Sequence, residues 1–298
     1  MVSFRRWKWS TWVPGLVLLA SVYLLLLLLL PTPPTLLEAP GAAPSLGSFE
    51  RLLCSSVAPD PPSCIGSKSL DHLVLVPGHA VLSLASKSHP SDHLSFTSDD
   101  AWFLHPYQRG QLHTLIAHIR QAVQIAAADP HALVVFSGGQ TRMPAGPISE
   151  GLSYWLAANG MDWFDVPVSR FDPSVRAITE DYALDSLQNL LFSVCRFREY
   201  TQRYPSKITV VGFQFKKPRF TRLHRSALAF PLANFSYVGI DPSDDDDPDA
   251  AAKRNDGEQT RSFGPFSRDI YACRHPTLLE KKRVRNPFAR AAPYYSKT

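Results

Sequence analysis

Short apolar runs separated by longer amphipathic stretches dominate the chain after residue 70. Four apolar runs are each followed by turn-forming or polar residues, as buried strands are; they cover 72–76, 132–136, 208–211 and 235–240. Between the first two runs, apolar residues recur at helical spacing from Leu112 to about Ala128. This alternation predicts a Rossmann-like α/β fold, with a mostly parallel sheet between two layers of helices.

Weaker patterns predict three further elements. The residues from Ser149 to Ala158 favour a helix, and those near 164–166 favour a short strand. Thr179 is a candidate N-cap for the next helix, because Glu180 and Asp181 would then lie in its first turn, where acidic side chains are favourable.

The longest apolar stretch lies near the start of the chain. Val13 to Leu30 contains no charged residue and would span about 27 Å as a helix. Arg5, Arg6 and Lys8 precede it, and no Lys or Arg follows until Arg51. The positive-inside rule therefore predicts a signal anchor that places the remaining chain in the lumen of the endoplasmic reticulum or Golgi. A cleaved signal peptide is the alternative, although its apolar core usually covers only about 7–15 residues.

Changes in composition divide the chain into six parts. After the anchor, a region rich in Pro, Ala and Ser is typical of a stalk. A later polar region with four consecutive aspartates lacks periodicity, so we expect a mobile acidic loop. The parts are a basic leader (1–12), the transmembrane anchor (13–30), the stalk (31–70), the α/β domain (71–240), the acidic loop (241–268) and a C-terminal extension with a basic segment (269–298).

The net charge of +5 comes partly from the leader and partly from a basic stretch between Lys281 and Arg290. A basic excess divided in this way favours a membrane surface or anionic small molecules over nucleic acid. The sequence has no zinc-finger or RNA-recognition spacing. We therefore expect two partners, the lipid bilayer through 13–30 and an anionic small molecule, and no nucleic acid.

The four cysteines are Cys54, Cys64, Cys195 and Cys273, and none forms a C-x-x-C pair. We therefore expect no metal centre. In an oxidising lumen, Cys54–Cys64 is the first pairing to test, and four reduced cysteines are the alternative. Cys195 lies in an apolar helical pattern that is typical of a core position.

Candidate chemistry lies where the predicted strands end, because ligands of open α/β sheets bind outside the carboxyl ends of the strands. The first two ends carry Gly78-His79 and Ser137-Gly138-Gly139, the latter followed by Arg142. Gly78 would let a ligand approach the backbone, and adjacent glycines can present backbone amides to an anion. A tight turn between strand and loop is an equally good explanation of the glycines.

Two other strand ends are followed by polar helices. Ser186 and Asn189 share one face of the helix predicted to begin at Glu180, and ordinary hydrogen bonding to a loop is the alternative role. Lys216 and Arg219 crowd the start of the last helix, where cations oppose the helix dipole unless an anion is present. A solvated basic face is the alternative for this second pair.

Taken in order, several motifs over roughly 71–240 resemble the bacterial envelope family that contains YdcF, SanA and ElyC, the domain of unknown function 218. They are Ser137-Gly138-Gly139, Ser149-Glu150, Glu180 with Ser186 and Asn189, and Phe215 to Arg219. Residues 269–273 and 285–288 resemble a fungal membrane-protein branch of that family. The resemblance implies a Rossmann-like fold, often behind a membrane segment, and proposed roles in cell-envelope biogenesis.

The resemblance also implies a polar pocket formed by Glu150, Glu180, Asn189 and Arg219. The sequence departs from the family at two positions. Asp185 stands where Asn is usual, and Gln214-Phe215-Lys216 stands where the family usually has a Ser/Phe-His motif. A reaction that needs this His would require His79 or His224 in its place.

Two functions remain open at this stage. The first is an enzyme acting on an anionic small molecule, such as a nucleotide, a glycan or a lipid-linked precursor. Glu150 or Glu180 would be its general base and Asn189 would orient substrate or water. The anion would be held by Gly138, Gly139, Arg142, Lys216 and Arg219. The second is a membrane-tethered binding or scaffold protein with a structural polar pocket. The sequence identifies no cofactor.

The sequon Asn234-Phe235-Ser236 provides a test of topology, because it is modified only if this region reaches the lumen. We expect glycosidase treatment to increase the gel mobility of the wild-type protein and to leave Asn234→Gln unchanged. Unchanged mobility of both proteins would remove this support for a lumenal domain.

Overall fold

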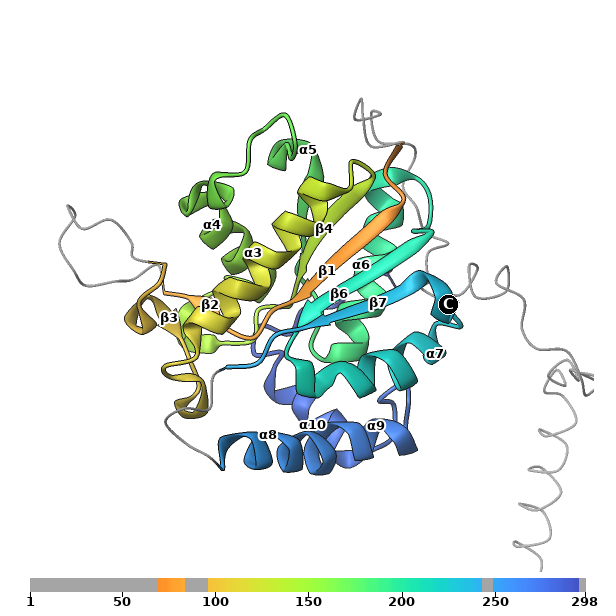
Figure 1. Cartoon of the computed structure of the whole chain (residues 1–298). Helices are drawn as coiled ribbons and strands as arrows, with labels where there is room; N and C mark the ends of the chain where they lie inside the picture. Colours follow the sequence, from red (N-terminus) through yellow and green to blue (C-terminus); the bar gives the residue numbers. More distant parts are fainter. Residues whose placement is uncertain (1–68, 84–95, 243–248, 295–298) are drawn as a thin grey trace, which may run out of the picture. The chain divides into compact units, whose positions relative to one another are not determined.

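The computed structural model describes residues 69–83, 96–242 and 249–294 (Figure 1). The expected leader, the anchor at 13–30, the stalk up to residue 68 and the four aspartates lie outside these residues, as do Cys54 and Cys64. In the part that is described, no helix has both the length and the apolar composition that a membrane span requires.

Five strands form one sheet in the order β5-β4-β1-β6-β7, and all neighbouring strands are parallel. The strands are β1 (His72–Pro77), β4 (Ala132–Ser137), β5 (Ala177–Glu180), β6 (Lys207–Gly212) and β7 (Phe235–Gly239). Numbered one to five along the chain, they follow the order 3-2-1-4-5 of a doubly wound sheet. The strand order reverses between β1 and β6, which is where such folds bind ligands.

The strands are apolar throughout because helices cover both faces of the sheet. Val74 and Val76 belong to the core on one face, and Leu73 and Leu75 belong to the core on the other. This alternation follows from the two-residue period of a strand. A strand that is buried on both faces cannot carry polar side chains at alternate positions, so it reads as a continuous apolar run.

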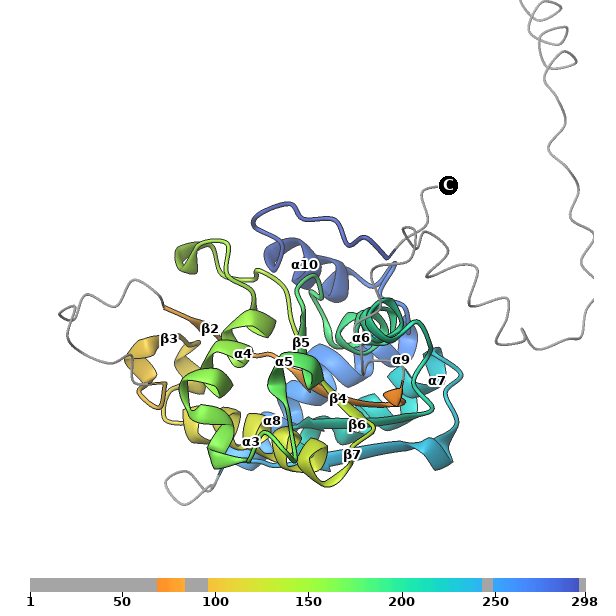
Figure 2. The same cartoon turned by 90° about the horizontal axis from the view of Figure 1, so that it is seen from above.

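Helices α3 (Leu112–Ala128) and α4 (Glu150–Gly160) pack on the first face. Helix α6 (Ser186–Thr201) and the segment formed by η7 (Arg219–His224) and α7 (Arg225–Ala227) lie on the second. Figure 2 shows α3 and α6 on opposite sides of the strands. The predicted three-layer, Rossmann-like α/β fold is therefore confirmed for the described residues.

Short elements connect these layers. The strands β2 (Val81–Leu82) and β3 (Trp102–Phe103) form a separate antiparallel ribbon. The other short elements are η2 (Asp99–Ala101), η3 (Pro106–Gln108), η4 (Met143–Ala145), α5 (Pro173–Arg176), η6 (Gln214–Lys216) and η8 (Leu232–Asn234).

The strand predicted at 164–166 is wrong. Residues Asp162–Asp165 form the turn η5, in which Trp163 and Phe164 have φ angles of 51° and 60°. The sheet instead contains β5, a strand that was not predicted. It has four residues, and its two middle positions are only half-buried. So short and mixed a segment presents no apolar run that the sequence pattern could reveal.

The predicted helix start at Glu180 is wrong as well. Thr179 lies inside β5, and α6 begins only at Ser186. Asp185 is the N-cap, and its carboxylate accepts a hydrogen bond from the amide of Gln188 at 2.9 Å. Thr and Asp are both good N-caps, so the sequence alone did not distinguish them.

The loop predicted at 241–268 is wrong beyond residue 249, because helices follow there. They are α8 (Ala250–Glu258), η9 (Gln259–Phe263), α9 (Gly264–Arg268) and then α10 (Pro276–Val284). Helix α8 has no apolar stripe, so helical periodicity could not reveal it. Its buried contact with the domain is made by a charged residue, Glu258.

The C-terminal helices are docked on the domain. Phe266 and Leu278 are buried and form a small core with Leu187 of α6 and Ala227 of α7. Leu70, which we expected in the stalk, is also buried, in the core on the α6 side of the sheet. The folded unit is therefore larger at both ends than the predicted 71–240.

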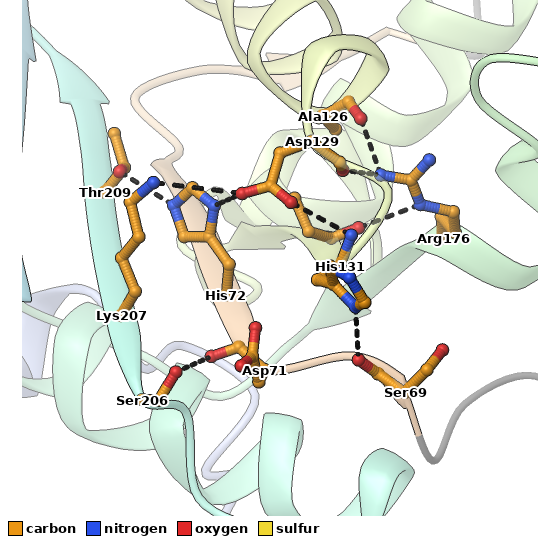
Figure 3. Close-up of polar contacts among 11 residues, drawn as sticks. Ser69, Asp71, His72, Ala126, Asp129, His131, Arg176, Ser206, Lys207 and Thr209 are labelled. Atoms are coloured by element: carbon orange, nitrogen blue, oxygen red, sulfur yellow. Dashed lines mark hydrogen bonds and ion pairs between the residues drawn. The ribbon is translucent and has the colours of Figure 1, made fainter.

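A cluster of polar side chains connects the amino ends of β1 and β6 with the end of α3 (Figure 3). His72 of β1 contacts Asp129 through Nδ1 and Thr209 of β6 through Nε2, both at 2.8 Å. Arg176 donates to the carbonyls of Ala126 and Asp129 at the end of α3. The Asp–His–Thr arrangement is like a catalytic triad, but His72 is 1% exposed and burial lowers its pKa. This cluster joins β1, β6 and the end of α3, and we assign it a structural role.

Candidate functional site

A cavity of about 590 Å³ lies at the carboxyl edge of the sheet. Its walls come from segments that follow β1, β4, β5 and β6, and from the C-terminal helices. The position coincides with the reversal of strand order between β1 and β6. The fold therefore brings together side chains from distant parts of the chain.

Most of the residues predicted for the site line this cavity. They are Gly78, His79, Arg142, Glu150, Ser186, Asn189, Lys216 and Arg219. Four others do not line it, namely Ser137, Gly138, Gly139 and Glu180. These four are buried beside the cavity, at the ends of β4 and β5.

The predicted anion-binding role of the two glycine amides is wrong. The amide of Gly138 donates to the carbonyl of Glu180 at 2.9 Å, and that of Gly139 donates to the carbonyl of Ala183 at 2.8 Å. Both groups thus hold the end of β4 against the segment that follows β5. Any anion in the cavity must be bound by side chains instead.

Close packing against Glu150 explains the glycines at 78 and 138. A Cβ at Gly78 would lie 2.5 Å from the Cβ of Glu150, and one at Gly138 would lie 2.7 Å from the same atom. Such distances are far below van der Waals contact, so neither position tolerates a side chain without a shift. The glycines therefore allow the close approach of α4 to the strand ends, and Gly78 also lines the cavity.

Glu150 is the first residue of α4, and its side chain is fixed at one oxygen. Ser149 caps the helix by accepting from the amide of Leu152 at 2.8 Å. The hydroxyl of Thr141 donates to Glu150 Oε1 at 2.5 Å. In the described residues, no hydrogen bond is made to Oε2. This carboxylate thus has one oxygen that Thr141 orients and one that makes no hydrogen bond within the described residues, and the residue lines the cavity.

Glu180 belongs to a buried polar cluster and not to the cavity. Its Oε2 accepts from the hydroxyl of Ser137 at 2.6 Å and its Oε1 accepts from the amide of Tyr182 at 2.7 Å. Asn189 donates to the carbonyl of Ser137 at 2.9 Å. Burial raises the pKa of Glu180 to about 7. The cluster fixes the ends of β4 and β5 relative to α6.

Lys216 lies among aromatic rings beside a histidine. Its Nζ is 4.7 Å from the ring centroid of Phe213 and 5.5 Å from that of Phe215. It is also 3.3 Å from Nε2 of His79. Burial, and secondly the charge of Arg219, lowers the pKa of Lys216 to about 7. Burial also keeps the pKa of His79 well below 6.5, so the imidazole is neutral and can accept from the ammonium group.

Arg219 is not a free anion-binding group, contrary to our expectation. Its guanidinium lies 3.1 Å from the carboxylate of Glu258 on α8, and both side chains are buried. Glu258 was assigned to a mobile loop by the sequence pattern, so nothing predicted this partner. The ion pair attaches the C-terminal helices to the wall of the cavity.

The cations of the C-terminal helices were also missed as site residues. The lining contains eight Lys and Arg side chains but only three carboxylates. Five of the eight follow residue 249, namely Lys253, Arg254, Arg261, Lys281 and Arg285. The basic segment noted in the sequence was the available signal for Lys281 and Arg285, and only the fold shows that these two residues line the cavity.

Ser186 contacts a buried histidine. Its hydroxyl lies 2.8 Å from Nε2 of His224, and burial keeps the pKa of His224 well below 6.5. The nearby charge of Arg219 further disfavours an imidazolium at this position. His224 therefore orients the hydroxyl of Ser186 and is poorly suited to take up its proton.

Comparison with known proteins identifies one relevant relative. The chain is 35% identical over 264 residues to a Saccharomyces cerevisiae protein described as uncharacterized protein YOR238W, and the match covers 74% of this chain and 86% of the yeast protein. No family model matches the sequence. No solved structure matches it.

The raised pKa of Glu180 gives the first structural prediction. The folded protein binds this proton more tightly than the unfolded chain, so the stabilisation is complete below pH 4.5 and is lost as the pH rises through about 7. Glu180→Gln has no such titration. Urea denaturation gives the free energy of unfolding of the variant and of the wild type at each pH. From pH 5 to pH 8, the difference between the two should therefore shift by about 2 to 3 kcal/mol in favour of the variant.

The control is Glu199→Gln, which removes a carboxylate whose side chain is 53% exposed. Its stability difference from the wild type should stay flat over the same range. A flat difference for Glu180→Gln would show that Glu180 is ionised in the folded protein throughout.

Proposed function

The chain belongs to the family that includes the yeast protein YOR238W, and we propose that it binds a phosphorylated small molecule in the cavity at the carboxyl edge of the sheet. The observation that carries this proposal is the excess of cations in the lining. Of the three carboxylates there, Glu258 is paired with Arg219 and Asp185 with Lys282. Within the described residues, five of the lining cations form no ion pair with a carboxylate, namely Arg142, Lys216, Arg261, Lys281 and Arg285.

Enclosed charge of one sign is costly, because desolvation and mutual repulsion act together. Arg142 illustrates this cost. Burial lowers its pKa, although the nearby carboxylate of Glu150 acts in the opposite direction, and its Nε is buried without a hydrogen-bond partner. A bound phosphate would accept hydrogen bonds from such a guanidinium and offset its charge. Phosphate therefore fits the lining better than a neutral ligand does.

Glu150 is the group that we assign to chemistry on the bound molecule. It is the one lining carboxylate that forms no ion pair among the described residues, and no hydrogen bond within them is made to its Oε2. A carboxylate in this position can act as a general base toward water or a substrate hydroxyl. Glu180, the other candidate base in the sequence, does not reach the cavity.

The proposal includes a membrane-tethered, lumenal location through 13–30, supported by the charge distribution around that stretch. Asn234, at the amino end of β7, is exposed and so accessible to modification. The resemblance to the domain of unknown function 218 fits the same site, because its implied pocket includes Glu150, Asn189 and Arg219.

One observation favours a second, non-catalytic function. The buried pair between Arg219 and Glu258 is a structural ion pair that holds α8 on the domain. In a scaffold protein, the whole polar lining would have this purpose. The cations without carboxylate partners argue for the ligand-binding alternative, and a binding experiment separates the two.

Arg142→Met should weaken binding of inorganic phosphate to the full-length protein at least tenfold, because one or more charge-assisted hydrogen bonds are lost. The melting temperature should change little, since Nε of Arg142 makes no hydrogen bond in the described structure. Isothermal titration calorimetry at low salt measures the affinity. The control, Arg203→Met, removes an exposed cation outside the lining and should bind normally. Equal affinity of all three proteins would refute the site.

Anion binding should weaken as the pH rises. A bound anion favours protonated Lys216, whose pKa in the free protein is about 7, so affinity is highest below pH 7 and is lost above it. Sulfate is a suitable probe, because its charge is constant between pH 6 and pH 9. The decline should approach tenfold per pH unit and become shallower in Lys216→Arg, whose guanidinium does not titrate. Identical pH profiles would exclude Lys216 from the site.

Glu150→Gln tests the catalytic assignment, because it preserves the side-chain shape and the acceptor for Thr141. Phosphate affinity should stay within about threefold of the wild type. Release of phosphate from a panel of organic phosphates should fall by about 100-fold or more. If the wild type binds phosphate but releases none from the panel, Glu150 has no catalytic role and the protein is a binder.

A further inference from the structure

The cations of the cavity form two groups that belong to different parts of the fold. The first group, Arg142, Lys216 and Arg219, follows β4 and β6 at the sheet edge. The second group comes from the C-terminal helices and their flanks and includes Arg261, Lys281 and Arg285. The first group of cations is sufficient to hold one phosphoryl group. The presence of the second group in the same cavity therefore requires an explanation of its own.

Arg285 connects the two groups electrostatically. Its charge lowers the pKa of Lys216 and Arg142 on the sheet side and that of Lys281 on the helical side. Arg285 also lines the cavity together with both groups. Its guanidinium donates to the carbonyl of Leu184 at 3.2 Å and forms no ion pair among the described residues. The two groups therefore face one shared space.

Lys281 and Arg261 also lack carboxylate partners within the described part of the chain. The ammonium group of Lys281 donates to the carbonyl of Arg261 and, at 3.1 Å, to the hydroxyl of Ser262. Burial, followed by the charge of Arg285, lowers the pKa of Lys281 to about 8. The helical side is thus as short of negative charge as the sheet side.

We propose that the ligand carries a diphosphate, with one phosphoryl group held by Arg142 and Lys216 and the other by Lys281 and Arg285. This inference rests on the proposed function and specifies its substrate class. A single phosphate held by Arg142 and Lys216 leaves Arg261, Lys281 and Arg285 without a carboxylate or phosphate partner among the described residues. The volume of about 590 Å³ is also in the range of cavities that hold whole organic ligands.

An aromatic pair at the cavity indicates where the organic part of such a ligand lies. Tyr107 and His105 both line the cavity, with ring centroids 4.9 Å apart and an interplanar angle of 20°. Tyr107 is 68% exposed, so much of its ring is free to contact a ligand. Tyr107 lines the same cavity as Arg142 and Arg285, to which we assign the diphosphate. A base, a sugar or an apolar chain attached to the diphosphate would rest against this pair.

The test compares inorganic phosphate with pyrophosphate in calorimetric titrations of the full-length protein. The wild type should bind pyrophosphate at least tenfold more tightly. Arg285→Met should lose at least tenfold in pyrophosphate affinity and less than threefold in phosphate affinity. Arg283→Met is the matched control: Arg283 lies in the last turn of α10, two residues before Arg285, pairs with Glu280 and does not line the cavity, so both affinities should be unchanged.

The outcomes separate this inference from the proposed function. Phosphate binding with no preference for pyrophosphate, or an equal loss of both affinities in Arg285→Met, would overturn the diphosphate assignment alone. Failure of the wild type to bind either probe would overturn the proposed function itself.

Two organic diphosphates test whether the ligand is nucleotide-like or lipid-like. Uridine diphosphate carries an aromatic base and geranyl diphosphate carries an apolar chain on the same group. Tighter binding of either one than of pyrophosphate supports the assignment and shows whether the natural ligand is nucleotide-like or lipid-like. At least tenfold weaker binding of both would overturn the placement of the organic part beside Tyr107.

Discussion

Positive charge that no carboxylate balances is the constraint on which the account of this molecule depends. Burial disfavours the charged forms of the cations at the sheet edge, and the lowered pKa of Lys216 shows that cost. The same side chains on an open surface would be solvated and screened. We propose an anion site because the buried cations of the sheet edge line one cavity together with cations of the C-terminal helices.

The fold creates this site by joining segments that are distant in sequence. A doubly wound sheet places the ends of β1, β4 and β6 at one edge, and close packing at Gly78 and Gly138 brings Glu150 to the same point. The Arg219–Glu258 pair then fixes α8 across the cavity. Removing either partner would leave a buried charge unpaired, so the docking of the C-terminal helices and the electrostatics of the site are coupled.

The sequence predicted the features that depend on burial. Strands β1, β4, β6 and β7 and helix α3 were readable because apolar side chains repeat at regular spacing, and they placed Glu150 and Lys216 near one edge. Strand β5 and helix α8 were missed because neither has a continuous apolar face. Glu180 and Gly138 were misassigned because hydrogen bonding by the backbone and by Ser137 leaves no signal in residue type.

The central claim is tested most directly by a crystal structure of the protein grown with saturating inorganic phosphate. The account predicts an ordered anion in the cavity, within hydrogen-bond distance of Arg142 and Lys216, with the Arg219–Glu258 pair intact. A cavity without an anion, in which these two cations have turned outward to solvent, would contradict it.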